Sequence, residues 1–380
     1  MFPTRRITTG GGDVFRDEFS LAFDGTDDFI QLPMPINYSA VTISAWIKVT
    51  EDSNTKVIVG ARDSSSDGLI FFLDSSERLV LRVNGQGTST TGMDITPNVW
   101  THVVGTYDGD KAIAYINTIA SSPKDISTDG ITTVTSNARI GCNAQSSANP
   151  YNGNISEIAI YNKSLSASEV KTLYNGREPY NHKEGVCSSN LQAWYRMGDG
   201  VLDTQPSNHT NSLLISDNTN ATKGSNLWTE TYSSNTGSWS EDGTNDLTQE
   251  NNAIKITGDG SDSDGARIKL RASDDMSSNL TVGKLYELAF QSKVSSGSSV
   301  NVQFQISNAH SFVNFVNYTT EYKQFRHYFI ATDATEAEIK CSAMGDGETI
   351  FMKDFSVREI NGNAGVGENF DGSNIVGDTP

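Results

Sequence analysis

The chain has 380 residues, which is enough for two domains with hydrophobic cores. Acidic residues outnumber basic ones by 46 to 28, so the formal net charge is −18 at pH 7. Such a charge repels nucleic acids and anionic membrane surfaces, and neither is an expected partner. No stretch approaches the run of about 18 apolar residues that a membrane span needs, so membrane insertion is not expected either.

The cysteines and the N-terminal segment bear on the compartment. Cys142, Cys187 and Cys341 are odd in number and widely spaced, so neither a disulfide framework nor a cysteine metal site is visible. We expect three free thiols and a reducing compartment, with one disulfide pair as the alternative. The first residues lack the apolar core of a signal peptide. We therefore expect a protein that acts inside a cell or leaves it by another route.

A polar arm at residues 1–18 precedes a series of predicted strands at 19–161. Apolar and polar residues alternate with a period of two at 41–49, as in a strand with one buried face. Further strand-type runs, bounded by turn signals such as Asn84-Gly85 and Asp108-Gly109, lie at 69–73, 79–83, 99–107, 112–117, 138–140 and 155–161. Short strands and turns at this spacing indicate a β-sandwich.

One helix is predicted at 166–175. Ser166 and Glu169 have the spacing of a capping box, in which each side chain bonds to the backbone amide of the other residue. The apolar stripe that follows consists of Val170, Leu173 and Tyr174. Asn175-Gly176 is a typical helix end.

The rest of the chain predicts a second β-rich region. A strand at 191–197 is assigned to the first domain, which we place at 19–200, and a polar linker follows at 201–225. The second domain, at 226–360, contains strand-type runs at 266–270, 285–291, 300–306, 324–330, 337–341 and 349–357. Residues 361–380 have little apolar surface to offset their ordering entropy, so we expect a flexible C-terminal tail. The predicted fold class is all-β, with two antiparallel β-sandwich (jelly-roll) domains and one short helix.

The order of motifs in the first domain resembles the laminin-G-like, concanavalin-A-like lectin superfamily. The motifs are LAFDGTDDFI at 21–30, VTISAWI at 41–47, WTHVVGTYDG at 100–109, GNISEIAIYN at 153–162 and the start of the helix. The resemblance covers about 160 residues and implies a lectin-type sandwich. The sequence departs from the family in the penultimate strand, where Ser156 is followed by Glu157 and the acidic position of the family has shifted or been replaced.

The second region is similar to jelly-roll carbohydrate-binding modules. The similarity rests on GKLYELAF at 283–290 and FMKDFSVRE at 351–359. In those modules an aspartate on the closing strand helps to bind a structural calcium ion, which implies Asp354 here. Tandem domains of these types, with a segment such as 197–200 (MGDG), also resemble structural proteins of tailed bacteriophages.

An enzymatic function is not expected. Glycoside hydrolases of concanavalin-like fold carry two catalytic carboxylates in a Glu-X-Asp-X-X-Glu pattern, and the sequence contains none. Glu336 and Glu338 form the nearest pair and lack the third acid. The five histidines show no metal-binding spacing and no companion nucleophile motif.

Calcium is the predicted cofactor, since Ca²⁺ takes oxygen ligands. In the family fold the first strand lies near the penultimate strand, so the resemblance implies that Asp24 and Glu157 face one ion. Asp354 is the candidate ligand in the second domain. The alternative is that Asp24, Asp27 and Asp28 are turn residues, selected for local hydrogen bonds.

Glycan binding requires exposed aromatic rings beside polar groups, because the C–H faces of sugars stack on rings. The candidates are Trp46, Tyr107 and Tyr151 in the first domain and Tyr328 in the second. The alternative for each is an ordinary core position.

The preferred hypothesis is a non-catalytic virion structural protein, as a head decoration, fibre or tail adhesin, that presents lectin-like domains to host surface glycans. We expect other capsid or tail proteins to bind the arm or the tail, a homo-oligomeric state, and assembly in the host cytoplasm. The alternatives are a secreted or surface bacterial lectin, which is extracellular, and a glycoside hydrolase with an atypical site.

Overall fold

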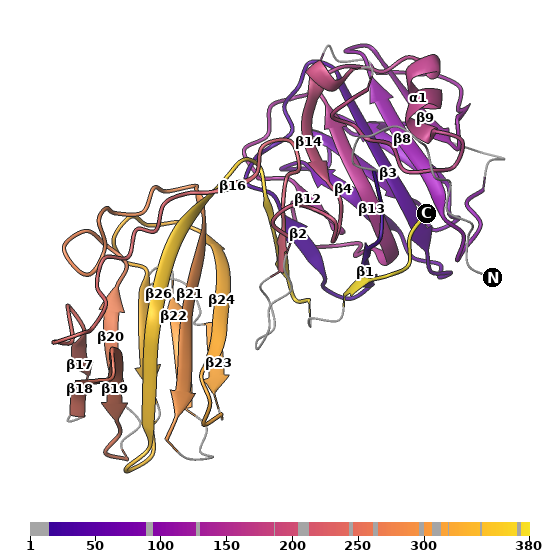
Figure 1. Ribbon diagram of the computed structural model, residues 1–380. Helices are drawn as coiled ribbons and strands as arrows, with labels where there is room; N and C mark the ends of the chain where they lie inside the picture. The colour runs from indigo at the N-terminus through magenta and orange to yellow at the C-terminus, as the bar shows by residue number, and fades with distance from the viewer. Residues whose placement is uncertain are drawn as a thin grey trace.

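The computed structural model describes residues 15–88, 94–126, 130–185, 187–203, 213–242, 246–260, 265–295, 300–305, 313–317, 319–342, 344–370 and 374–380. They form two antiparallel β-sandwiches with a single α-helix among the described residues (Figure 1). The predicted all-β fold class is confirmed. Of the predicted arm, residues 1–14 lie outside the described residues.

The larger sheet of the first sandwich has nine strands. Its strand order is β10-β9-β8-β3-β13-β1-β28, with β11 also paired to β9 and β14 to β13. The strands are Ser20–Asp24 (β1), Val41–Val49 (β3), Thr101–Tyr107 (β8), Lys111–Ile116 (β9), Ile119–Ala120 (β10), Lys124–Asp125 (β11), Asn152–Tyr161 (β13), Leu191–Tyr195 (β14) and Ile375–Val376 (β28).

The facing sheet has eight strands in the order β15-β27-β2-β12-β4-β5-β6-β7. They are Phe29–Gln31 (β2), Lys56–Ala61 (β4), Leu69–Leu73 (β5), Leu79–Val83 (β6), Gln86–Gly87 (β7), Arg139–Ile140 (β12), Leu213–Ile215 (β15) and Gly365–Glu368 (β27). The inward side chains of both sheets form one apolar core, in which Ile43, Ile47, Phe71 and Leu81 are fully buried.

The predicted helix is confirmed as Ala167–Tyr174 (α1). The capping box is present, because the Ser166 hydroxyl accepts from the Glu169 amide and the Glu169 side chain accepts from the Ser166 amide. Asn175 ends the helix in the left-handed conformation. α1 is not long and apolar enough to cross a membrane, and no other described helix is.

The second sandwich pairs a six-stranded sheet with a five-stranded sheet. The first has the order β18-β19-β26-β21-β24, with β16 also on β26, and the second has the order β17-β20-β25-β22-β23. The strands of the six-stranded sheet are Thr222–Lys223 (β16), Asp246–Glu250 (β18), Ala253–Thr257 (β19), Leu285–Val294 (β21), Lys323–Ile330 (β24) and Thr349–Asn361 (β26). Those of the five-stranded sheet are Ser240–Asp242 (β17), Gly265–Lys269 (β20), Val300–Gln305 (β22), Val313–Asn317 (β23) and Glu338–Ser342 (β25).

The C-terminal segment returns to the first sandwich instead of forming a separate tail. β27 pairs with β2 and β15, and β28 pairs with β1. Phe370 is 1% exposed in the first core, where its ring meets Phe23 edge-on. The prediction of a flexible tail at 361–380 missed these contacts because it considered only the local apolar content. The second sandwich is therefore inserted between β15 and β27 of the first.

The chain enters and leaves the second sandwich through two adjacent antiparallel strands. β16 pairs with the end of β26, so that Thr222 faces Asn361 (Figure 1). Apolar side chains from both sandwiches meet at this junction, and they are Leu214, Leu285, Tyr328, Ile360, Ala364 and Val366. The predicted linker at 201–225 thus includes a strand of each sandwich, β15 and β16.

Candidate functional site

The predicted calcium ligands Asp24 and Glu157 do not meet. In the β1–β13 pair Asp24 stands opposite Asn152. Glu157 is farther along β13, at roughly 16 Å for a rise of about 3.3 Å per residue. Asp24 instead lies with Asp27 and Asp28, and their ligand oxygens are within 4.8 Å of one another. The predicted pairing was wrong because it assumed that the acid on β13 lies opposite the turn after β1.

Glu157 lies at a β-bulge, which explains the shifted acid in the motif. Its φ is 52°, and the register of β13 with β3 shifts between Ser156 and Ala159. Its carboxylate accepts hydrogen bonds from Trp194 Nε1 at 2.5 Å and from Arg196 Nε at 3.0 Å. Burial raises the pKa of Glu157 to about 7. Burial and the neighbouring Glu157 raise the pKa of Asp17 to about 10, so this pair retains a proton at neutral pH.

Paired carboxyl groups with raised pKa values also occur in glycoside hydrolases, but this pair is covered. Glu157 is only 1% exposed. Residues 15–18 lie over it. The Phe15 ring packs on Trp194, with the ring centroids 5.8 Å apart. The Arg196 guanidinium lies over the Phe15 ring and donates a hydrogen bond to the Arg16 carbonyl. The carboxyl pair therefore fastens the segment 15–18 to the sheet, where no substrate reaches it.

Asp354, the predicted calcium ligand of the second domain, also lies at a bulge. Its φ is 55°, and the register of β21 with β26 shifts beside it. Its side chain is 60% exposed, and its nearest charged partner is Lys353 at 3.7 Å. Among the described residues, Asp354 belongs to no cluster of three or more potential metal ligands.

The four predicted sugar platforms are buried, which corrects that prediction. Trp46, Tyr107, Tyr151 and Tyr328 are each at most 4% exposed. Tyr174 of α1 stacks on Trp46, Tyr107 and Tyr151 belong to the first core, and Tyr328 lies in the junction between the sandwiches. A platform must offer a ring face to the sugar, and these rings pack against protein instead.

A pocket of about 330 Å³ lies at the edge of the five-stranded sheet of the second sandwich. β17 pairs with residues 265–267 of β20. The last two residues of β20, Ile268 and Lys269, have no partner in β17. This leaves a notch beside Ile268 and Lys269. The volume lies in the lower part of the range of small-molecule sites.

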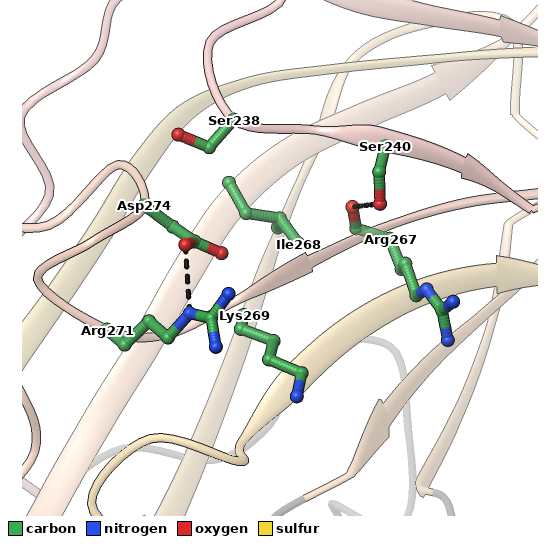
Figure 2. Close-up of a pocket in the computed structure, with 7 residues that line it drawn as sticks. All are labelled: Ser238, Ser240, Arg267, Ile268, Lys269, Arg271 and Asp274. Atoms are coloured by element: carbon green, nitrogen blue, oxygen red, sulfur yellow. Dashed lines mark hydrogen bonds and ion pairs between the residues drawn. The ribbon is translucent and has the colours of Figure 1, made fainter.

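Six polar or charged side chains line this pocket, together with the edge of the buried Ile268. Figure 2 shows Arg271 and Asp274 on one side, Ser240 and Arg267 on the other, and Ile268 between them. Ser238 and Lys269 complete the lining. Arg271 Nε donates to Asp274 Oδ1 at 2.9 Å, and Lys269 Nζ donates to Glu336 at 2.7 Å. Arg267 makes no ion pair among the described residues, so the site carries one positive charge in excess.

A buried aspartate holds the two loops that form the pocket. Asp275 is 5% exposed and accepts hydrogen bonds from the Ser238 amide at 2.8 Å and the Tyr232 hydroxyl at 2.9 Å. Its own carbonyl accepts from the Thr229 amide at 2.9 Å. Tyr232 in turn accepts from Trp239 Nε1. Ser238 and Arg271 therefore lie on segments whose relative position is fixed before any ligand binds.

The strand at 266–270 was predicted from the sequence, but this pocket was not. A signal was present, because Arg267, Lys269 and Arg271 alternate along one strand of an otherwise acidic chain. A second pocket, of about 300 Å³, lies on the first sandwich and is lined by Lys183, Ser188, Ser189, Leu191 and Thr219. It lacks the acid–base pairs of the first pocket.

Comparison with known proteins agrees with the fold. Residues 24–171 match the family described as the concanavalin A-like lectin/glucanases superfamily, and the match lies within the first sandwich. No curated protein matches the chain.

Three solved structures illustrate the remote similarity. A Bacteroides ovatus protein described as carbohydrate-binding is 19% identical, with 53% of this chain and 56% of that chain covered and a TM-score of 0.42. The carbohydrate-binding module of a Ruminococcus gnavus sialidase, bound to α2,3-sialyllactose, is 14% identical, with 40% and 95% covered and a TM-score of 0.34. A xylan-binding domain from Paenibacillus barcinonensis is 11% identical, with 36% and 96% covered and a TM-score of 0.30.

Proposed function

We propose that this chain is a non-catalytic carbohydrate-binding protein whose ligand site is the pocket of the second sandwich. The observation that carries the proposal is the pocket itself, a preformed notch lined by hydroxyl, guanidinium, ammonium and carboxylate groups. Sugars present many hydroxyl groups, and such a lining offers hydrogen-bond donors and acceptors to them. The lectin-type family match of residues 24–171 supports the same class of function.

A binding role is favoured over hydrolysis. The pocket contains a single carboxylate, Asp274, which is engaged by Arg271. Glycoside hydrolysis ordinarily needs two carboxyl groups that face each other across the substrate. Glu157 is buried on the first sandwich beneath the segment 15–18, to which its partner Asp17 belongs.

The test is affinity electrophoresis of the whole chain through gels that contain individual soluble polysaccharides. We expect retardation by at least one polysaccharide, and loss of that retardation when Ser240→Glu places a carboxylate at the exposed rim of the pocket. The matched control is Val282→Glu, which introduces the same side chain at a site that is 59% exposed. Unretarded migration in every gel contradicts the proposal, and so does release of reducing sugar from the retarding polysaccharide.

Calcium is retained as a proposal with a corrected ligand set. Asp24, Asp27 and Asp28 supply oxygen atoms close to one another, which is the donor type that Ca²⁺ takes. Two of these carboxylates also bond the local backbone: Asp24 Oδ1 accepts from the Thr26 amide and Asp28 Oδ2 from the Asp24 amide. Bound calcium would fix the turn between β1 and β2.

The virion role, the capsid or tail partners, the homo-oligomeric state and the host-cytoplasmic assembly remain predictions from the sequence. An extracellular bacterial lectin fits the same carbohydrate-binding proposal. The virion role and the bacterial lectin role can be separated by electron microscopy of virus particles that are labelled with an antibody against the chain.

A further inference from the structure

We propose that the pocket of the second sandwich selects sugars that carry a carboxylate, with Arg271 as the group that binds it. This inference rests on the proposed carbohydrate-binding function and names the chemical class of its ligand. The ligand would be a hexuronic acid or a sialic acid unit within a glycan.

Among the described residues, the Arg271 side chain is hydrogen-bonded through only one of its three nitrogen atoms. Its Nε is held by Asp274 Oδ1 at 2.9 Å, and Asp274 also accepts from the Ser273 hydroxyl at 3.1 Å. The two terminal amino groups of Arg271 have no hydrogen-bond partner within the part of the chain that the structure describes. A guanidinium that is oriented through Nε presents these amino groups as a planar fork, which matches the two oxygens of a carboxylate.

The residues that line the pocket carry more positive than negative charge. Three of its seven residues are cationic, although acids outnumber bases by 46 to 28 in the whole chain. Glu336 neutralises Lys269 and Asp274 neutralises Arg271, which leaves the charge of Arg267. One excess positive charge matches a monoanionic sugar. It does not match a polyphosphate, which carries several negative charges.

The geometry of the pocket is preformed. Asp275, which is 5% exposed, links the Ser238 segment to the loop that carries Arg271 and Asp274. Ser238 and Ser240 can then bond to sugar hydroxyl groups while Arg271 holds the carboxylate. Because little ordering is needed on binding, the charge-assisted hydrogen bonds contribute to affinity with little loss of conformational entropy.

The experiment is isothermal titration calorimetry of the whole chain with two acidic probes, a galacturonate trimer and sialyllactose. The methyl ester of each probe keeps the ring and its hydroxyl groups but removes the charge. We expect at least one acid to bind and its ester to bind about tenfold or more weakly, which is the effect of losing one charge-assisted contact. Binding of the galacturonate trimer would identify a hexuronic acid as the ligand, and binding of sialyllactose would identify a sialic acid.

Protein variants locate the site. Arg271→Gln and Arg267→Gln should each weaken binding of the acid and leave the affinity for the ester unchanged. Arg271→Lys keeps the charge but loses the fork, so it should also weaken binding. The control, Lys353→Gln, removes the same charge from the other sheet of the same sandwich, and it should have no effect. Melting curves of all variants establish that they are folded.

Three outcomes overturn the inference. If the acid and its ester bind with equal affinity, or if only a neutral polysaccharide binds, the ligand is not selected by its carboxylate. The carbohydrate-binding function would still stand. If Lys353→Gln lowers the affinity for the acid while Arg271→Gln and Arg271→Lys do not, the binding site lies elsewhere. Absence of binding to every acidic and neutral probe refutes the proposed function as well.

Discussion

The two sandwiches obtain their strands from the chain in different ways. The second is built from one continuous stretch, from β16 to β26. The first needs strands from both sides of that stretch, because β27 and β28 complete its two sheets after the second sandwich has been formed. The first sandwich therefore depends on contacts of very long sequence separation, and the second does not.

The outer surfaces differ as well. On the first sandwich, α1 covers Trp46 and residues 15–18 cover Glu157, so the polar groups on this side are enclosed. On the second, β17 begins only at Ser240, opposite Arg267, and leaves the edge of β20 open beside Ile268. The same sandwich architecture therefore has a pocket where the pairing of two strands is incomplete and the edge is not covered.

The largest expected effect concerns the returning segment. Phe370→Ala should destabilise the first sandwich by about 3–5 kcal/mol, the cost of removing a buried phenylalanine. Hydrogen exchange measured by peptide should increase in β1, β2 and β13. Phe355→Ala, which opens the aromatic cluster of Trp228 and Phe290, should instead loosen the second sandwich. Unchanged exchange in the first sandwich of Phe370→Ala would contradict the inserted arrangement.

The next effect concerns the buried Asp275. Asp275→Ala removes the acceptor of Tyr232 and of the Ser238 amide, so urea denaturation should show a loss of about 2–3 kcal/mol. The neighbouring Asp274→Ala breaks only a partly exposed ion pair and should cost less than about 1 kcal/mol. Equal costs for the two variants would mean that Asp275 does not organise the pocket.

Calcium should stabilise the first sandwich if the turn of Asp24, Asp27 and Asp28 binds it. At about 100 times the dissociation constant, a ligand of the folded state adds about 2.7 kcal/mol. Differential scanning calorimetry should show a higher melting temperature with calcium and a lower one with chelator. Asp24→Asn should remove the difference, whereas Asp354→Asn should keep it. Melting that is indifferent to calcium and chelator identifies the three aspartates as turn residues only.

The smallest expected effect is a pH dependence confined to the first sandwich. Glu157 has a pKa of about 7 in the folded state against a usual value of 4.5, so the folded chain holds a proton that the unfolded chain has released. Stability should therefore fall as the pH rises from about 5 through 7.

Asp17→Asn separates this effect from general alkaline destabilisation. Asp17, with its pKa raised to about 10, also holds in the folded chain a proton that the unfolded chain releases. The amide does not titrate, so the fall in melting temperature between pH 5 and pH 8 should become shallower. Glu18→Gln, an exposed neighbour, is the control and should leave the slope unchanged. An identical slope in Asp17→Asn would show that the carboxyl pair does not titrate in this range.

Local sequence determined most of the individual elements. The period-two alternation at 41–49 corresponds to β3, and the capping box of Ser166 and Glu169 begins α1 as predicted. These signals are readable because they depend on neighbours within a few residues. β4 was missed, since all six of its residues are buried and it shows no alternation.

Tertiary structure alone decided the insertion and the site. Nothing in Gly365–Glu368 indicates that it pairs with β2, more than 300 residues earlier, and a Cβ on Gly365 would lie 2.4 Å from Ile30. Three alternating cations, Arg267, Lys269 and Arg271, could be read from the sequence. The pocket between them exists because the pairing of β17 with β20 begins only at Ser240 and Arg267, and because Asp275 joins two loops. A strand's partners depend on the whole chain.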